Sequence, residues 1–239
     1  MGAYRPNERR KKYLGSAFCF SSSGDFRGFN SYLAEDHLKL AGSFQKKIKE
    51  FKEQNDEVER VVIHFYKKMK REESKMVQQA LKELNLDVPV VVLTIHKTKS
   101  KDLVPVDRSR PHRLPMSGTW MQSGGKQFLL FNNTRFDDPG EKLSSYPFPV
   151  KVYVDLATEE SAKGHWHEHR EILQRQLEDR EWLEELLEQV YRFSRLNWRS
   201  VSIKSLPVTV SYPEMVAKKF PFFDGDVIPE FGKRNFWFL

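Results

Sequence analysis

Two apolar segments and the amphipathic segment between them constrain the fold more than any other feature of the chain. Residues 60–66 (RVVIHFY) and 88–96 (VPVVVLTIH) are short, mostly apolar and rich in β-branched side chains, as strands buried on both faces are. Residues 72–86, between them, repeat apolar side chains at the spacing of a helix. A strand, a helix and a strand in this order form a right-handed parallel crossover. The unit predicts an α/β fold.

The remaining segments predict further elements around this unit. We expect strands at 13–21, 126–131 and 148–156, and helices at 31–54, at about 167–195 and from the Tyr212-Pro213 step onward. No internal repeat or low-complexity linker separates these segments. The 239 residues therefore predict one α/β domain with a mixed sheet.

Charge is distributed unevenly along the chain, which carries a net charge of +7. Residues 1–12 and 97–113 each carry an excess of four positive charges, and residues 192–204 hold four basic residues and no acidic one. Residues 159–190 hold ten acidic and four basic residues, and their apolar positions have helical spacing, which predicts a solvated acidic face. The basic segments favour a polyanionic partner such as nucleic acid.

Several common active-site motifs are absent from the sequence. Residues 15–24 (GSAFCFSSSG) lack the lysine of a P-loop, and the lone Cys19 excludes a disulfide framework or a multi-cysteine zinc site. His165 and His169 share a helix face, but no acidic zinc-protease motif accompanies them, so we interpret them as solvated. The N-terminus is no secretory signal and no apolar stretch is long enough to span a bilayer, so we expect a cytoplasmic protein without a membrane partner.

Lysines follow the two buried strands, where a metal-dependent nuclease would need acids. Two-metal sites hold their cations with carboxylates that converge from strand ends. Lys67 and Lys68 follow the first strand and Lys97 follows the second. Positive charge at this edge would repel Mg²⁺ and opposes a two-metal mechanism.

The chain ends on Phe236, Trp237, Phe238 and Leu239. Burying each such side chain is worth roughly 1.5–3 kcal/mol, so we expect the tail to pack against the domain. A terminal carboxylate buried with it would need a cation, which a basic side chain or a metal can supply. The alternative is a tail that covers the edge of the core and leaves its carboxylate at the surface.

Three parts of the chain together resemble a known family. Residues 194–220 (SRLNWRSVSIKSLPVTVSYPEMVAKKF), the unit at 60–96 and the FWFL terminus resemble the PIWI domain of prokaryotic Argonaute proteins, most closely the short, catalytically inactive type. The resemblance runs over nearly the whole chain, and GAYR at the start resembles the end of the family's first strand. It implies a ribonuclease-H-like fold, with a mixed central sheet flanked by helices, over residues 1–239.

The resemblance also implies a binding site for the 5′-phosphate of a guide strand. The carboxylate of Leu239 would hold a divalent cation (Mg²⁺ or Mn²⁺) against that phosphate, and Lys219, or else Lys218, would contact the 5′ end. The following guide phosphates would be contacted by residues in the turn after the long helix, namely Arg195, Asn197, Arg199 and Lys204, with Tyr212 a weaker candidate. Trp198, in the same turn, is interpreted as a core residue.

The sequence departs from the cleaving members of that family. Their acidic tetrad would place its first position near Gly2, its second at Lys68 and its last near Glu214 of this chain. A lysine at the second position would disable two-metal cleavage. We therefore expect a module that binds guide and target nucleic acid (RNA or DNA) in prokaryotic defence, and that is not an enzyme.

The chain is also too short for the MID domain that precedes PIWI in this family. We expect a PIWI domain without its first strand, either a fragment or one half of a split protein. A MID-containing chain or segment would then be its partner for tight guide binding. A separate effector protein, triggered when the target is recognised, is a further expected partner.

Two other functions remain open from the residues. One is an active metal-dependent ribonuclease-H-like endonuclease, whose carboxylates would come from Asp25, Glu35, Asp155 and Glu214. The other is a basic subunit that docks an acidic protein partner.

Overall fold

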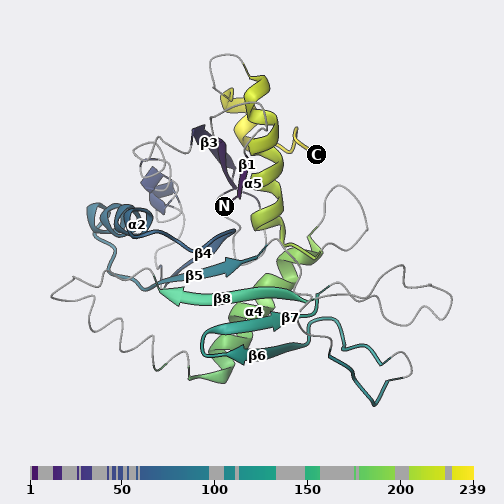
Figure 1. Cartoon of the computed structure of the whole chain (residues 1–239). Helices are drawn as coiled ribbons and strands as arrows, with labels where there is room; N and C mark the ends of the chain where they lie inside the picture. The colour runs from purple at the N-terminus through teal and green to yellow at the C-terminus, as the bar shows by residue number, and fades with distance from the viewer. Residues whose placement is uncertain are drawn as a thin grey trace.

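The structure is a computed structural model of the chain and divides into a five-stranded and a three-stranded sheet with flanking helices (Figure 1). It describes residues 2–4, 13–17, 26, 28–33, 42, 45–46, 48–50, 53, 58, 60–96, 105–110, 113–132, 149–156, 175, 178–196, 205–223 and 228–239. The predicted α/β class with a mixed central sheet is confirmed.

The five-stranded sheet has the order β4–β5–β8–β7–β6. Its strands are β4 (Val61–Phe65), β5 (Val90–Ile95), β6 (Trp120–Gly124), β7 (Gln127–Leu130) and β8 (Val150–Leu156). Strands β4 and β5 pair in parallel, with Val61 opposite Val90, whereas the other neighbouring strands pair antiparallel. Helix α2 (Arg71–Glu83) connects β4 to β5, so the predicted parallel crossover is confirmed.

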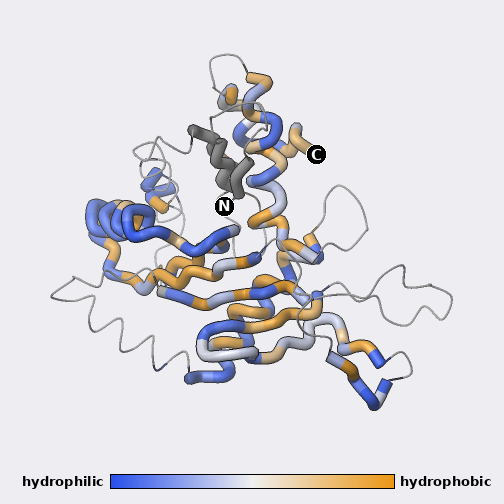
Figure 2. Tube along the Cα trace, in the orientation of Figure 1, coloured by the Kyte–Doolittle hydropathy of each residue, from blue (hydrophilic) through white to orange (hydrophobic). Residues whose placement is uncertain are grey.

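Strand β5 lies between two hydrophobic cores and contributes side chains to both. Successive side chains point to opposite faces of a strand. Accordingly, Val90 and Val92 pack in the cluster beneath α2, whereas Val91, Leu93 and Ile95 pack in the cluster beneath α4 (Arg180–Arg195). Figure 2 shows hydrophobic colouring along the strands of this sheet and hydrophilic colouring along much of α2. The apolar runs in the sequence therefore mark strands covered on both faces.

An aspartate cap sets the start of α4, and the exposed face of this helix carries ion pairs. Asp179 accepts the backbone N–H of Glu181 at 2.9 Å and begins α4, as an aspartate at an N-cap does. Arg180 pairs with Glu184 at 3.0 Å, one turn along the exposed face of the helix. The opposite face, which includes Leu186, is buried. The predicted acidic, solvated helix face is confirmed over the described part of this segment.

The second sheet and the end of the chain form a separate layer. Strands β1 (Gly2–Tyr4), β2 (Tyr13–Ala17) and β3 (Phe29–Leu33) pair antiparallel in that order. Helix α5 (Val208–Lys219) packs along β1 and β2. The short 3-10 helices η1 (Phe220–Phe222) and η3 (Glu230–Arg234) follow α5, and the chain ends beside it (Figure 1).

The predicted elements differ from the structure at four points. The helix predicted at 31–54 is wrong at its start, because residues 31–33 belong to β3; helical residues are described from 42 onward. The helix predicted at about 167–195 is interrupted at Glu178 and Asp179, and α4 begins at Arg180. Strand β6 is not among the predicted strands, since four of its five residues are exposed and give no apolar signal. Helix α5 begins at Val208, before the Tyr212-Pro213 step, so Pro213 lies inside it.

No helix in the described ranges is long and apolar enough to cross a membrane.

Candidate functional site

The C-terminal tail packs into an aromatic cluster, which confirms its predicted burial. Phe238 is fully buried, with its ring 5.3 Å from Phe29 and 5.5 Å from Tyr212 in edge-to-face geometry. Phe236 lies 4.5 Å from Phe26. Edge-to-face pairs align the positive ring edge with the negative ring face, so they orient side chains as well as bury them. The tail is therefore held in a defined position against β3 and α5.

Trp237 fixes the last turn of the chain. Its Nε1 donates a hydrogen bond to the carbonyl of Gly232 at 2.7 Å, and its ring lies 4.8 Å from that of Phe223. A Cβ at Gly232 would lie 3.1 Å from Ile228 and 3.3 Å from Trp237 Nε1, so a side chain here would disturb the contact. The N–H of Leu239 then donates to the carbonyl of Phe236 at 3.0 Å, and Leu239 is half-buried at the edge of the cluster.

Two lysines end α5 beside this cluster. Lys218 pairs with Glu214 at 3.2 Å, while Lys219 is exposed. Ala217 and Phe220, which flank the two lysines, belong to the same cluster as Leu239. The structure therefore brings the predicted Lys218, Lys219 and Leu239 into one layer.

Tyr212, the weakest of the predicted contacts, is 1% exposed and lies inside that cluster. Its ring therefore packs as a core side chain, between Phe236 and Phe238. The residue supports the tail from within the fold.

Arg195, at the end of α4, makes contacts within the protein. Its guanidinium lies over the ring of Tyr191, 4.6 Å from the ring centroid, and donates to the Tyr191 hydroxyl at 3.1 Å. It also donates to the Ser117 hydroxyl, which joins α4 to the segment before β6. Nη2 of Arg195 donates both of these hydrogen bonds, so a phosphate contact would have to use the other nitrogens of the guanidinium. The predicted Asn197, Arg199 and Lys204, together with Trp198, lie outside the described residues.

The carboxyl end of β4 is the edge at which ligands bind in open α/β sheets. Lys67 pairs with the buried Glu73 at 2.6 Å, and Glu73 also accepts the backbone N–H of Lys70 at 2.8 Å. Glu73 thus caps α2 while it neutralises Lys67. Lys68, the residue at the second expected acidic position, is exposed.

The carboxylates of the nuclease alternative are engaged elsewhere or not described. Asp155 pairs with Lys126 at 3.6 Å, and Glu214 pairs with Lys218. Asp25 and Glu35, like Cys19, His165 and His169, lie outside the described residues. Within the described part of the chain, no three His, Cys, Asp or Glu side chains gather as a metal site.

A buried histidine, which no motif in the sequence singles out, joins β4 to α5. His64 is 8% exposed, its Nδ1 lies 2.7 Å from the Thr209 hydroxyl oxygen, and Phe193 packs edge-on against its ring. Burial lowers the pKa of His64 from 6.5 to about 3, because the charged imidazolium loses its hydration. His64 is therefore neutral and structural near neutral pH.

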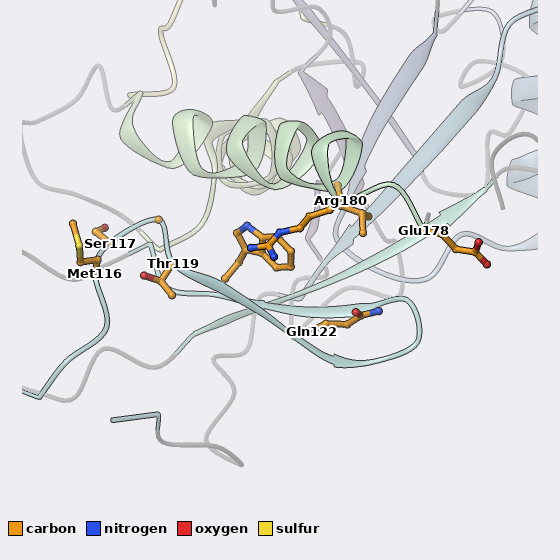
Figure 3. Close-up of a pocket in the computed structure, with 9 residues that line it drawn as sticks. Met116, Ser117, Thr119, Gln122, Glu178 and Arg180 are labelled. Carbon is orange, nitrogen blue, oxygen red and sulfur yellow. The ribbon is translucent and has the colours of Figure 1, made fainter. Parts of the chain in front are cut away.

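A shallow pocket of about 860 Å³ lies between β6 and the start of α4 (Figure 3). Arg180 reaches from α4 into this pocket, and its guanidinium lies 5.9 Å from the centre of the Trp120 ring. Ser117, the partner of Arg195, lines the opposite end. The lining has one arginine and one carboxylate, Glu178, and no paired acid and base that would suggest catalysis.

No protein-family model matches the sequence. The Piwi protein of the archaeon Archaeoglobus fulgidus is 26% identical over 197 residues, which cover 74% of this chain and 40% of that protein. Crystal structures of Marinitoga piezophila Argonaute are similar in fold. The complex with 5′-OH guide RNA and target DNA gives a TM-score of 0.55 at 14% identity, and the complex with 5′-OH guide RNA gives 0.54 at the same identity.

Both Argonaute structures align with 93% of this chain and with 29% of their own length. This chain thus spans 40% of the Piwi protein that it matches and under a third of the Argonaute. The mixed sheet and flanking helices align with the region of Argonaute that has the ribonuclease-H-like fold, as the sequence predicted. The chain is thus similar in sequence to part of a Piwi protein and similar in fold to part of a prokaryotic Argonaute.

Proposed function

We propose that this chain binds a guide strand and its paired target, and that it does so without cleaving either. The observation that carries the proposal is the C-terminal layer, in which Leu239 packs at the edge of an aromatic cluster and Lys218 and Lys219 lie between two residues of that cluster, Ala217 and Phe220. We infer that the two lysines and the terminal carboxylate would together bind an anion, with a cation bridging the anion to the carboxylate. The Argonaute of similar fold was crystallised with guide RNA and target DNA, which supports nucleic acid as the ligand.

A divalent cation fits the donor chemistry of this layer. Mg²⁺ in phosphate-binding sites is often held by one or two carboxylates, with phosphate oxygens and water completing the shell. The Leu239 carboxylate would supply the protein oxygen, and the cation would supply charge neutralisation between that carboxylate and a phosphate. Lys219 would then contact the same phosphate directly.

The proposal that the chain does not cleave rests on charge at the sheet edge. A two-metal nuclease needs several carboxylates at one point. Here Lys67 and Lys68 follow β4, and Glu73, the buried carboxylate nearby, is engaged by Lys67 and the α2 cap. We place the chain among the short, inactive prokaryotic Argonautes on this basis.

The proposed partners follow from the length of the relatives. The chain spans 40% and 29% of the two proteins compared above. A MID-containing segment or chain would complete the pocket for the guide 5′ end. A separate effector protein, responding to target recognition in prokaryotic defence, would provide the output.

The test compares guide oligonucleotides that carry a 5′-phosphate or a 5′-hydroxyl, each with Mg²⁺, Mn²⁺ or a chelator. RNA and DNA guides are measured separately. We expect tighter binding of the phosphorylated guide, and a preference that disappears in chelator.

The variants in this test separate the effect of moving the terminal carboxylate from the effect of disturbing the fold. Deleting the last residues would remove the buried Phe238, so a Gly-Gly extension, which moves the carboxylate and keeps Phe238, is the better change. The extension and Lys219→Ala should each remove the preference, whereas Lys75→Ala on the exposed face of α2 should leave it intact. Equal affinity for both guide ends in every condition would refute the carboxylate–metal–phosphate arrangement.

A further inference from the structure

Two phenylalanines of the C-terminal layer are exposed to solvent. Phe222, the last residue of η1, is 86% exposed, and Phe231 in η3 is 76% exposed. They are the most exposed large hydrophobic side chains in the described part of the chain. Burial of a phenylalanine is favourable, so a fold that presents two of them outward leaves them available to a ligand.

The residues next to both phenylalanines contact the same side chain, Trp237. Phe223, next to Phe222, packs its ring 4.8 Å from that of Trp237. Gly232, next to Phe231, accepts the hydrogen bond from Trp237 Nε1 at 2.7 Å. Phe222 and Phe231 are therefore each next in sequence to a residue that contacts the same indole. The segments that carry them belong to the yellow C-terminal part of the chain in Figure 1.

Basic residues accompany the two rings. Lys218 and Lys219 end α5 immediately before η1, and Lys233 and Arg234 end η3. Aromatic rings among cationic side chains are typical of proteins that bind single-stranded nucleic acid, where bases stack on the rings and phosphates contact the cations. The apolar core of a protein interface, by contrast, is depleted in lysine. The combination favours a nucleic-acid strand over a protein partner.

We propose that Phe222 and Phe231 are a stacking platform for unpaired bases of the bound strand. The inference rests on the proposed function, because the strand end would be held by Lys218, Lys219 and Leu239 in the same layer. The lysine side chains would bind phosphates of the nucleic-acid backbone, and the rings of Phe222 and Phe231 would stack on the bases that follow. Stacking is tolerant of base identity, because every base presents a π face.

The experiment measures binding of 5′-phosphorylated single-stranded oligonucleotides to the full chain and to four variants. Phe222→Leu combined with Phe231→Leu keeps apolar side chains and removes the rings, whereas Phe222→Tyr combined with Phe231→Tyr keeps them. Val106→Ala, at another exposed apolar position, is the matched control. The fourth variant, Lys219→Ala, reports on the phosphate contact. Both phenylalanines are exposed, so circular dichroism should show unchanged folding.

We expect the leucine variant to bind roughly tenfold more weakly, and the tyrosine and Val106→Ala variants to bind as the wild-type chain does. An abasic site placed at each position in turn should weaken wild-type binding at the stacked positions and leave the leucine variant unaffected. Wild-type affinity in the leucine variant would overturn the platform while the proposed function stands. Unchanged binding with altered self-association would also overturn it and assign the rings to a protein contact. A wild-type chain that binds no oligonucleotide would refute the proposed function itself.

Discussion

Lowering the pH should destabilise this fold through one buried side chain, His64. The folded protein holds His64 neutral, with a pKa of about 3, whereas the unfolded chain returns it to 6.5. Because the folded pKa lies below the unfolded one, unfolding takes up a proton at any pH between the two values. The stabilisation from the neutral imidazole is complete above 6.5 and is lost progressively as the pH falls toward 3.

The loss of unfolding free energy follows from how far the pH lies below the pKa of His64 in the unfolded chain. Each pH unit below the unfolded pKa costs about 1.4 kcal/mol of unfolding free energy for one such group. Between about pH 8 and about pH 5, His64 should therefore remove about 2 kcal/mol, which is a substantial part of the stability of a typical domain. The imidazole is buried between Thr209 and Phe193, and this burial opposes its protonation.

The measurement is urea unfolding at a series of pH values for wild type and for His64→Asn. Asparagine stays uncharged and can place an amide near the Thr209 hydroxyl, so the variant lacks the proton uptake while it retains a polar partner. We expect the unfolding free energy of the wild type to fall about 2 kcal/mol further than that of the variant over this pH range. His96→Asn, at an exposed histidine beyond β5, is the control and should behave as wild type. Parallel pH curves for wild type and His64→Asn would refute the reasoning, as would an NMR titration of His64 near 6.5.

Two further predictions concern the tail and the sheet edge. Phe238→Ala should lower the free energy of unfolding by about 3–5 kcal/mol, since it removes a fully buried ring; Phe238→Leu should cost less, and thermal melts of both variants measure the order. A melting temperature unchanged by Phe238→Ala would show that the tail is not docked. The wild-type chain should not cut a guide-matched target in Mg²⁺ or Mn²⁺, as followed on denaturing gels. Site-specific cutting that Asp155→Asn abolishes would instead establish the nuclease alternative.

The regular core of this protein follows from short-range patterns in its sequence. Buried strands β4 and β5 carry side chains on two covered faces, so both strands are mostly apolar, and the amphipathic α2 between them dictates a parallel pair. Strand β6 gave no such signal, because most of its side chains face solvent. Strand β3 was hidden inside a segment whose apolar spacing also suits a helix.

The roles of the candidate site residues stay predictions, and their contacts could not be read from the sequence. Resemblance to a family singled out Lys218, Lys219 and Leu239; Leu239 packs in the same cluster as Ala217 and Phe220, which flank the two lysines. The partners of the other side chains depend on tertiary contacts. Arg195 contacts Ser117, 78 residues earlier, and His64 meets Thr209, 145 residues later. No local pattern encodes pairings across such separations, and so neither was predicted.

The contact of Phe238 with Phe29 has a consequence for synthesis of the chain. The aromatic cluster joins Phe29 of β3 to Phe238, far along the sequence. Contacts between such distant segments carry a large loop-closure cost and form late in folding. The crossover unit at 60–96 has local contacts and can form while the chain is still on the ribosome. The C-terminal layer can assemble only after Phe238 has emerged from the ribosome. A stalled or truncated product would therefore have a folded five-stranded sheet and no assembled C-terminal layer.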